Sequence, residues 1–336
     1  MIRRLWFLLF ALVLLALPFA MSRFGLDLAC QVFIACIGSL ALMLLTGFAG
    51  QISLGHAGLL AAGALTTGIL FQETGAPFWI TLPAAITIGA LLGFVFGMPS
   101  LRLRGIYLAV STIAMHFMVI YVGSEYENTR GLSSGVVVDP PSLAGIELSD
   151  GRAWYYVLLA VAALVYLLFG NLLRTRTGRA WSAIRTRDTV AIALGIDIAR
   201  YKLLAFVVSS AVTAMAGALL TYYRGFVSSE AFSLDLTIQY VAMIIIGGIG
   251  SQMGAVLGAV FVTLLPYGIE RAMTILTGGQ SDANWTFSVN YAIFGIVMCA
   301  FLLFEPQGMV GIGRRLWRRN ASASNPVAQA PARADG

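Results

Sequence analysis

Apolar segments about as long as a membrane is thick recur along this chain from one end to the other. A helix needs about 20 apolar residues to cross the hydrocarbon core of a bilayer. Ten segments of fifteen to twenty-one residues approach or reach that length, and the first, eighth and ninth are the shortest. The pattern predicts about ten membrane-spanning helices, with a range of eight to ten. The segments are residues 5–20, 28–46, 54–71, 79–97, 105–123, 153–170, 203–223, 236–250, 253–269 and 287–304.

Composition supports the same fold class. Hydrophobic residues make up 59% of the chain and charged residues only 11%, whereas soluble domains are about one quarter charged. The sequence is therefore typical of an all-α polytopic membrane protein. A net charge of +6 would favour nucleic-acid binding in a soluble protein. Here the cations follow the loops between spans, so we expect contact with membrane lipid and none with nucleic acid.

The positive charges also predict an orientation, because Lys and Arg are enriched in the cytoplasmic loops of membrane proteins. If the N-terminus lies inside, 16 of the 21 cations and only 4 of the 15 acids fall on the cytoplasmic side. Reversing the topology would invert this bias, so we expect both termini in the cytoplasm. A cleaved signal peptide is the alternative for the first segment, since Arg3 and Arg4 precede an apolar core and small residues follow near Ala20.

The longest external loop, residues 123–152, divides the spans into two halves of five. An odd number of spans per half makes the halves run in opposite directions, as in proteins with inverted repeats. We expect residues 1–313 to form one membrane domain. Residues 314–336 begin with arginines and become rich in Ala, Ser and Pro. This composition predicts a disordered cytoplasmic tail whose basic start contacts anionic lipid headgroups.

A polar segment, residues 171–202, separates the sixth and seventh spans and carries seven cations against two acids. Its apolar residues recur at helical spacings, which predicts one short amphipathic helix on the cytoplasmic side. Asp188 suits the start of such a helix and Gly195 its end. The apolar residues are Trp181, Ile184, Ala191, Leu194 and Ile198.

Two glycine-rich segments interrupt the apolar runs, and both fall on the cytoplasmic side of the expected topology. Glycines at this density let backbones approach closely, and non-helical backbone at membrane depth is tolerated only against protein or a water-filled cavity. Two interpretations remain open: broken helices that line a translocation path, or tight turns in which Gly254 and Gly258 pack helices. The polar and glycine positions are Gly47, Gly50, Gln51, Ser53, Gly55, His56 and Gly58, then Gly247, Gly248, Gly250, Ser251, Gln252, Gly254 and Gly258.

Ionisable groups are scarce inside the spans. We interpret His56 as a neutral histidine that hydrogen-bonds a neighbouring helix, with a proton relay as the alternative, and His116 as structural. No acid lies centrally in any span, which disfavours an ion-coupled carrier. The three cysteines lack metal-ligand or disulfide spacing, so we expect neither a metal site nor a disulfide.

Sequence motifs for catalysis or nucleotide binding are absent: there is no P-loop, nucleophile elbow or HExxH. We therefore expect no catalytic residues and no cofactor. A transport protein with this composition is either a passive pore or takes its energy from a partner. Residues 171–202 offer the surface for such a partner.

Six motifs in order resemble those of the LivM-type permeases of bacterial branched-chain amino acid ABC importers. The similarity extends from about Leu40 to Met309. The matching segments are GQISLGHAG (50–58), RLRGIYLAVST (102–112), GRAWSAIRTRDTVAIALGIDIARYKLLAF (178–206), GFVSSEAFSL (225–234), GGIGSQMGAVLGA (247–259) and FEPQGM (304–309).

The resemblance implies that residues 1–313 form the permease domain of a heteromeric importer in the bacterial inner membrane. It implies a second homologous permease subunit, two cytoplasmic ABC ATPase subunits that hydrolyse ATP, and a periplasmic substrate-binding protein. The chain itself would then be no enzyme. The implied solutes are leucine, isoleucine and valine.

The same resemblance implies two groups of functional residues. The cytoplasmic loop would couple the chain to an ATPase, and its arginines would pair with acids there unless they only follow the positive-inside rule. The coupling residues are Arg179, Trp181, Ile184, Arg185, Asp188, Ala191, Leu194, Gly195 and Ile196, with Arg187 as a further cation. The translocation-path residues are Gly47, Gly50, Gln51, Ser53, His56, Gly247, Gly250, Ser251 and Gln252.

Two departures from the family pattern leave alternatives open. The loop reads Thr189-Val190-Ala191 where the family has a bulkier apolar residue and two alanines, and residues 129–135 lack the family's paired glycines and acid. The second departure keeps urea, short amides, aromatic acids and, more distantly, ribose-like sugars open as solutes. A stand-alone channel or facilitator is the alternative from another class, but it leaves the amphipathic helix unexplained. A membrane enzyme is least favoured.

Overall fold

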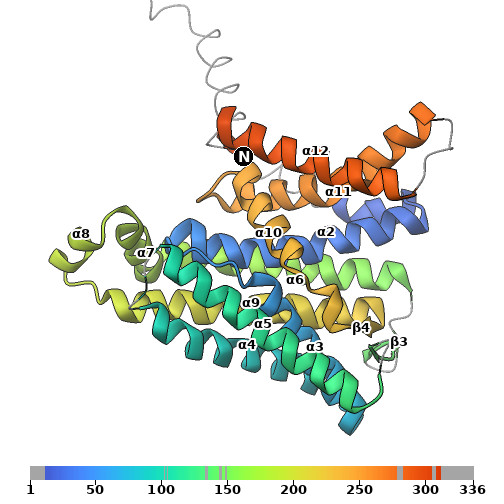
Figure 1. The fold of residues 1–336 in the computed structure, drawn as a ribbon, viewed down its shortest axis with the longest axis horizontal. Helices are drawn as coiled ribbons and strands as arrows, with labels where there is room; N and C mark the ends of the chain where they lie inside the picture. The colour runs from blue at the N-terminus through green and yellow to red at the C-terminus, as the bar shows by residue number, and fades with distance from the viewer. Residues whose placement is uncertain are drawn as a thin grey trace, which may run out of the picture.

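The computed structural model describes residues 12–311 apart from 102, 104, 133, 134, 144, 145, 148, 149, 278–282 and 305–307. These residues form a bundle of long helices lying side by side (Figure 1). Two short helices, α7 and α8, lie at one end of the bundle and the short strands at the other (Figure 1). We call these the α7–α8 end and the strand end. The predicted tail, residues 314–336, and the arginines at 3, 4, 102 and 104 lie outside the described residues.

The described chain consists of long helices, short helical segments and short strands. The long helices are α2 (Arg23–Leu42), α3 (His56–Thr74), α4 (Phe78–Ser100), α5 (Ile106–Thr129), α6 (Gly151–Arg174), α9 (Ile198–Arg224), α10 (Leu234–Gly247), α11 (Gln252–Thr277) and α12 (Ala283–Phe304). The short elements are the π-helix η1 (Met43–Phe48), α7 (Arg176–Thr186), α8 (Asp188–Ala193) and the 3₁₀ helix η2 (Ser229–Ala231). The strands are β1 (Val136–Val137), β2 (Ser142–Leu143), β3 (Ile146–Glu147) and β4 (Phe226–Val227).

Seven helices among the described residues are long and apolar enough to cross a membrane. They include the weakly predicted eighth and ninth spans, and α11 extends eight residues beyond the predicted end of its segment. The count of ten and the two five-span halves stay predictions. The seven are Arg23–Phe48, Phe78–Pro99, Ile106–Thr129, Gly151–Arg174, Ile198–Arg224, Ser229–Gly247 and Gln252–Ile275.

The predicted third span, α3, is not among the seven, and its place in the bundle explains why. Helices α4, α5, α9 and α10 all contact it, His56 at its start lies against Gly38 of α2, and most of its residues are buried. A helix enclosed by other helices needs no lipid-compatible surface, so it tolerates small and polar residues. The predicted first span lies partly outside the described residues, but residues 12–20 are helical and accept hydrogen bonds from Tyr155 and Tyr156 of α6.

The centre of the bundle is the contact of α9 with α3 and α4. Small residues let the backbones touch: a Cβ atom added at Gly217 would overlap the carbonyl oxygen of Leu60, and one at Gly63 would overlap that of Ala214. A buried hydroxyl of α9 also bonds to the neighbouring helix α2, because Ser209 Oγ donates to Ala41 O at 2.7 Å. Close backbone contact of this kind is how helices pack where no water drives them together.

Two loop predictions need correction. Helix α5 continues to Thr129 and α6 begins at Gly151, so the external loop is shorter than the predicted 123–152. Within it β1 pairs with β4 in antiparallel register, Val136 opposite Val227, which joins the loop to the segment after α9. The 171–202 segment also differs from the prediction: α6 runs on to Arg174, and α7 and α8 replace the single amphipathic helix.

Candidate functional site

Helix α7 is fixed to the bundle by its apolar residues. Trp181 and Ile184, three residues apart, are buried, and Trp181 Nε1 donates to Tyr201 O at 2.8 Å. Gly178 allows the sharp corner from α6, because a Cβ atom there would overlap the backbone of Leu173. These residues therefore position the α7–α8 end and are unavailable for direct contact with a partner.

The break between α7 and α8 falls at Arg187, whose extended backbone (φ −159°, ψ 122°) ends one helix and precedes the next. Asp188 starts α8 as predicted, and its carboxylate pairs with Lys202 Nζ at 3.1 Å. Gly195 ends the turn as predicted, with a positive φ of 74°. This left-handed conformation suits glycine because a Cβ atom strains it.

The exposed face of α8 is apolar, and the sequence pattern located only part of it. Val190, Ile192 and Leu194 are 49%, 62% and 69% exposed, whereas Ala191 is buried. We call these three residues the α8 patch. The pattern had placed Leu194 on one face with the buried residues of α7, but the helix breaks between them. The pattern did not identify Val190 and Ile192 as exposed, because a new helix with a different orientation begins at Asp188.

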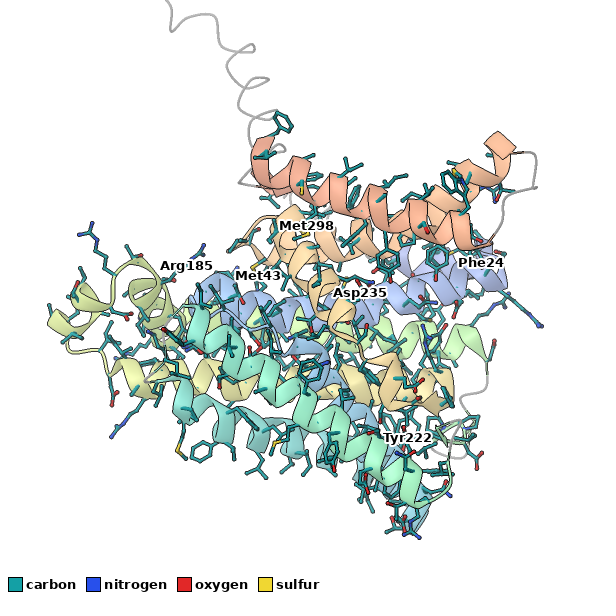
Figure 2. All side chains as sticks on the ribbon, viewed as in Figure 1. Phe24, Met43, Arg185, Tyr222, Asp235 and Met298 are labelled. Atoms are coloured by element: carbon teal, nitrogen blue, oxygen red, sulfur yellow. The ribbon has the colours of Figure 1, made fainter. Side chains whose placement is uncertain are left out.

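Arg185 connects α7 to both glycine-rich segments, at the end of the bundle where Figure 2 labels it beside Met43. Its guanidinium donates to Gly47 O at the end of the π-helix η1. A Cβ atom at Gly250 would overlap the same guanidinium, and Gly50 packs against the Arg185 backbone and stem. A cation at the negative end of a helix dipole is favourable. Arg185 thus faces its own chain.

The two glycine-rich segments are turns that touch each other at the α7–α8 end. Gly250 N lies 3.1 Å from Met43 Sδ, and Gly247 packs directly on Gly254. Gln51 Nε2 donates to Lys202 O at 3.1 Å, which ties the first turn to the start of α9. The packing role expected of Gly254 is confirmed, and so is that of Gly258, which abuts the Met243 carbonyl.

Polar groups of the predicted path lie buried beside these turns. His56 Nε2 lies 3.0 Å from Gly38 O of α2, which confirms the expected bond to a neighbouring helix. Ser53 Oγ and Gln252 Nε2 are buried without a hydrogen-bond partner among the described residues. Ser251 Oγ instead accepts from Gly254 N at 3.2 Å. A role of these groups in a translocation path stays a prediction.

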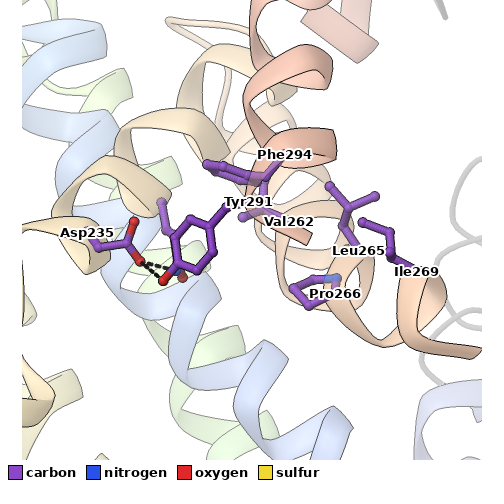
Figure 3. A pocket seen from close by; sticks show the side chains of 8 residues that line it. Asp235, Val262, Leu265, Pro266, Ile269, Tyr291 and Phe294 are labelled. Carbon is purple, nitrogen blue, oxygen red and sulfur yellow. Dashed lines mark hydrogen bonds between the residues drawn. The ribbon is translucent and has the colours of Figure 1, made fainter. Parts of the chain in front are cut away.

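A pocket of about 230 Å³ lies between α10, α11 and α12, away from all the predicted site residues (Figure 3). Asp235 and Gln239 of α10 and Tyr291 of α12 supply its polar side. Gln239 Nε2 and the Tyr291 hydroxyl both donate to Asp235 Oδ2, at 2.9 and 3.2 Å. Asp235 is one of the acids that lie outside the centres of the predicted spans, and no sequence motif pointed to it.

A second, more open pocket lies at the strand end, where Trp154, Tyr222 and Arg224 are among its lining residues. Figure 2 labels Tyr222 far from Arg185. Within the described residues no group of three or more His, Cys, Asp or Glu side chains is arranged to hold a metal ion.

Comparison with known proteins found a matching family model and several similar sequences. A family model described as "Branched-chain amino acid transport system / permease component" matches residues 24–302. The high-affinity branched-chain amino acid transport system permease protein LivM of Escherichia coli K12 is 31% identical, over 95% of this chain and 78% of that protein. LivM of Salmonella typhimurium is 30% identical, over 93% and 76%. The autoinducer 2 import system permease protein LsrC of Enterobacter sp. strain 638 is 28% identical, over 72% and 67%. No solved structure matches.

Proposed function

Because the chain belongs to the permease component family of branched-chain amino acid transport systems, we propose that it is one of two permease subunits of an ATP-driven importer. The second permease, two cytoplasmic ATPases and a periplasmic substrate-binding protein complete the proposed complex in a bacterial inner membrane. The proposed solutes are leucine, isoleucine and valine, which the names of the LivM relatives support. Urea, short amides and other small solutes remain the alternative within the class.

The observation that carries this proposal is the α8 patch. Two of its apolar side chains, Val190 and Ile192, stand exposed on the six-residue helix α8, and the third, Leu194, directly follows that helix. Exposed Arg187 and Arg200 flank them. A compact apolar surface with a charged rim is typical of an interaction site. The occupant that we propose is a groove of the cytoplasmic ATPase, with its acids facing the arginines.

The contacts of Arg185 support a route from that surface to the membrane helices. A shift of α7 and α8 would pull on Gly47 at the end of η1 and on the turn at Gly250. Both turns lead directly into long helices, α3 and α11. Nucleotide-driven movement of the ATPases would therefore bias the arrangement of helices through one junction.

A stand-alone facilitator is the second candidate, and a co-purification experiment separates the two. The chain is expressed with the ATPases of its transport system, and the amount of ATPase recovered per chain is measured. Ile192→Glu places a charge in the α8 patch and should abolish recovery, while Ile192→Met keeps the apolar surface and should preserve it. No recovery with the parent chain, or equal recovery with Ile192→Glu, would favour the facilitator.

A further inference from the structure

The pocket between α10, α11 and α12 carries a carboxylate without a cationic partner. Asp235 takes part in none of the ion pairs formed among the described residues, which are Arg130–Glu73, Arg200–Asp197 and Lys202–Asp188. Both of its described hydrogen bonds arrive at one oxygen, Oδ2. Figure 3 shows this carboxylate and the Tyr291 hydroxyl on the same side of the pocket. The second oxygen, Oδ1, is left to accept from a ligand.

The helix opposite supplies a further acceptor. Pro266 lies inside α11 and lines the pocket. Because proline has no N–H, the carbonyl of the residue four positions earlier loses its helical partner. That residue is Val262, which also lines the pocket. A carboxylate and a spare carbonyl form a set of acceptors that suits a group with several N–H donors and a positive charge, such as an ammonium.

The rest of the lining is apolar and limits the size of the occupant. Val262, Leu265 and Phe294 contribute side chains to it. Drug-sized ligands occupy pockets of about 300–1,000 Å³, so a pocket of about 230 Å³ suits a smaller molecule. Among the described residues no lysine or arginine lines it, so none of them would pair with a carboxylate of the ligand.

We propose that this pocket is a binding site for a small primary ammonium compound with a compact aliphatic body. Asp235 pairs with the ammonium group, and Val262, Leu265 and Phe294 contact the body. On the transport route this occupant is the amino end and side chain of the solute, a role that rests on the proposed function. Asp235, in the first turn of α10, also stabilises that helix. That role alone would not require an apolar lining or a Val262 carbonyl without a helical partner.

Equilibrium binding to the purified complex tests the proposal with three probes of one carbon skeleton. Leucine and isopentylamine carry the ammonium group and should bind, whereas isovalerate carries only the carboxylate and should not. Asp235→Asn keeps the hydrogen-bonding shape and removes the charge, so it should weaken isopentylamine binding at least about tenfold. Equal binding of isovalerate and isopentylamine, or unchanged binding in Asp235→Asn, would overturn the proposal.

Two phenylalanine substitutions on α11 test the pocket without changing the carboxylate. Leu265→Phe should block isopentylamine by occupying the apolar side, while Leu264→Phe, at the adjacent exposed position, should leave binding unchanged. Equal effects of the two variants would contradict the assignment. ATP-dependent uptake by the parent complex is measured in parallel. Absence of uptake by the parent complex would refute the proposed function. Uptake by the parent that is unchanged in Leu265→Phe and Asp235→Asn would refute only the solute role of the pocket.

Discussion

Arg185 shows how much a single side chain can connect in this molecule. Its guanidinium meets Gly47 at the end of η1 and lies where any side chain at Gly250 would have to go. These contacts lie within the chain although Arg185 is exposed, and its pairing with an ATPase acid stays a prediction. Arg187 and Arg200, both exposed, are the cations placed to meet a partner.

Replacement of Arg185 should uncouple ATP hydrolysis from transport. A hydrogen bond to a charged group contributes about 1.5–3 kcal/mol, so we expect Arg185→Ala to lower solute uptake about tenfold or more while ATPase assembly persists. Arg176→Ala, at the exposed first residue of α7, serves as the matched control for loss of positive charge. Uptake and ATP hydrolysis are measured in reconstituted vesicles. Loss of assembled ATPase in Arg185→Ala would point to a docking role and against this connection.

At the scale of elements, the α7–α8 pair shows where a periodic pattern misleads. The spacing predicted one helix, but the chain forms two, and Trp181, Ile184 and Ala191 lie buried within the chain. No glycine or proline marks the break at Arg187 in the sequence. Nothing in the local sequence therefore indicated that Val190 and Ile192 would form the exposed face.

The end of α8 gives a prediction about its geometry. Gly195 has a φ of 74° and nothing within 4 Å of an added Cβ atom, so only backbone strain opposes substitution. A left-handed conformation costs most residues about 1–2 kcal/mol but is accessible to asparagine. We expect Gly195→Val to reduce ATPase recovery and uptake, and Gly195→Asn to retain most of both. Equal behaviour of the two variants in the co-purification measurement would show that the patch does not depend on this turn.

At the scale of the whole molecule, some features could be predicted from the sequence and others could not. Length and hydropathy located the seven candidate spans among the described residues, including the short eighth and ninth, because a lipid-facing helix must be apolar along its length. The same criterion gives no sign that α3 is enclosed, since enclosure depends on neighbours. The α10–α12 pocket was out of reach for a similar reason: Asp235 and Tyr291 lie 56 positions apart, and no local pattern joins them.

Orientation in the membrane is a prediction at this same scale. Cysteine is introduced at Thr189, at the α7–α8 end, or at Glu230, at the strand end, in a chain whose exposed Cys299 is replaced by serine. A membrane-impermeant maleimide added outside should label Glu230→Cys and spare Thr189→Cys until the membrane is permeabilised. The reverse pattern would place α8 outside the cell and remove the basis for ATPase contact. The buried cysteines, Cys30 and Cys36, should react in neither case.

The contact of α9 with α3 and α4 has a mechanical consequence. These helices come from opposite halves of the sequence, yet their backbones meet without intervening side chains at Gly63 and Gly217. Such close contact leaves no room for the helices to slide past each other, and separating them would give up this backbone packing. Helices α3, α4 and α9 therefore behave as a single stiff unit. In the importer that we propose, a passage that opens first to one side and then to the other would therefore form beside this unit and not through it.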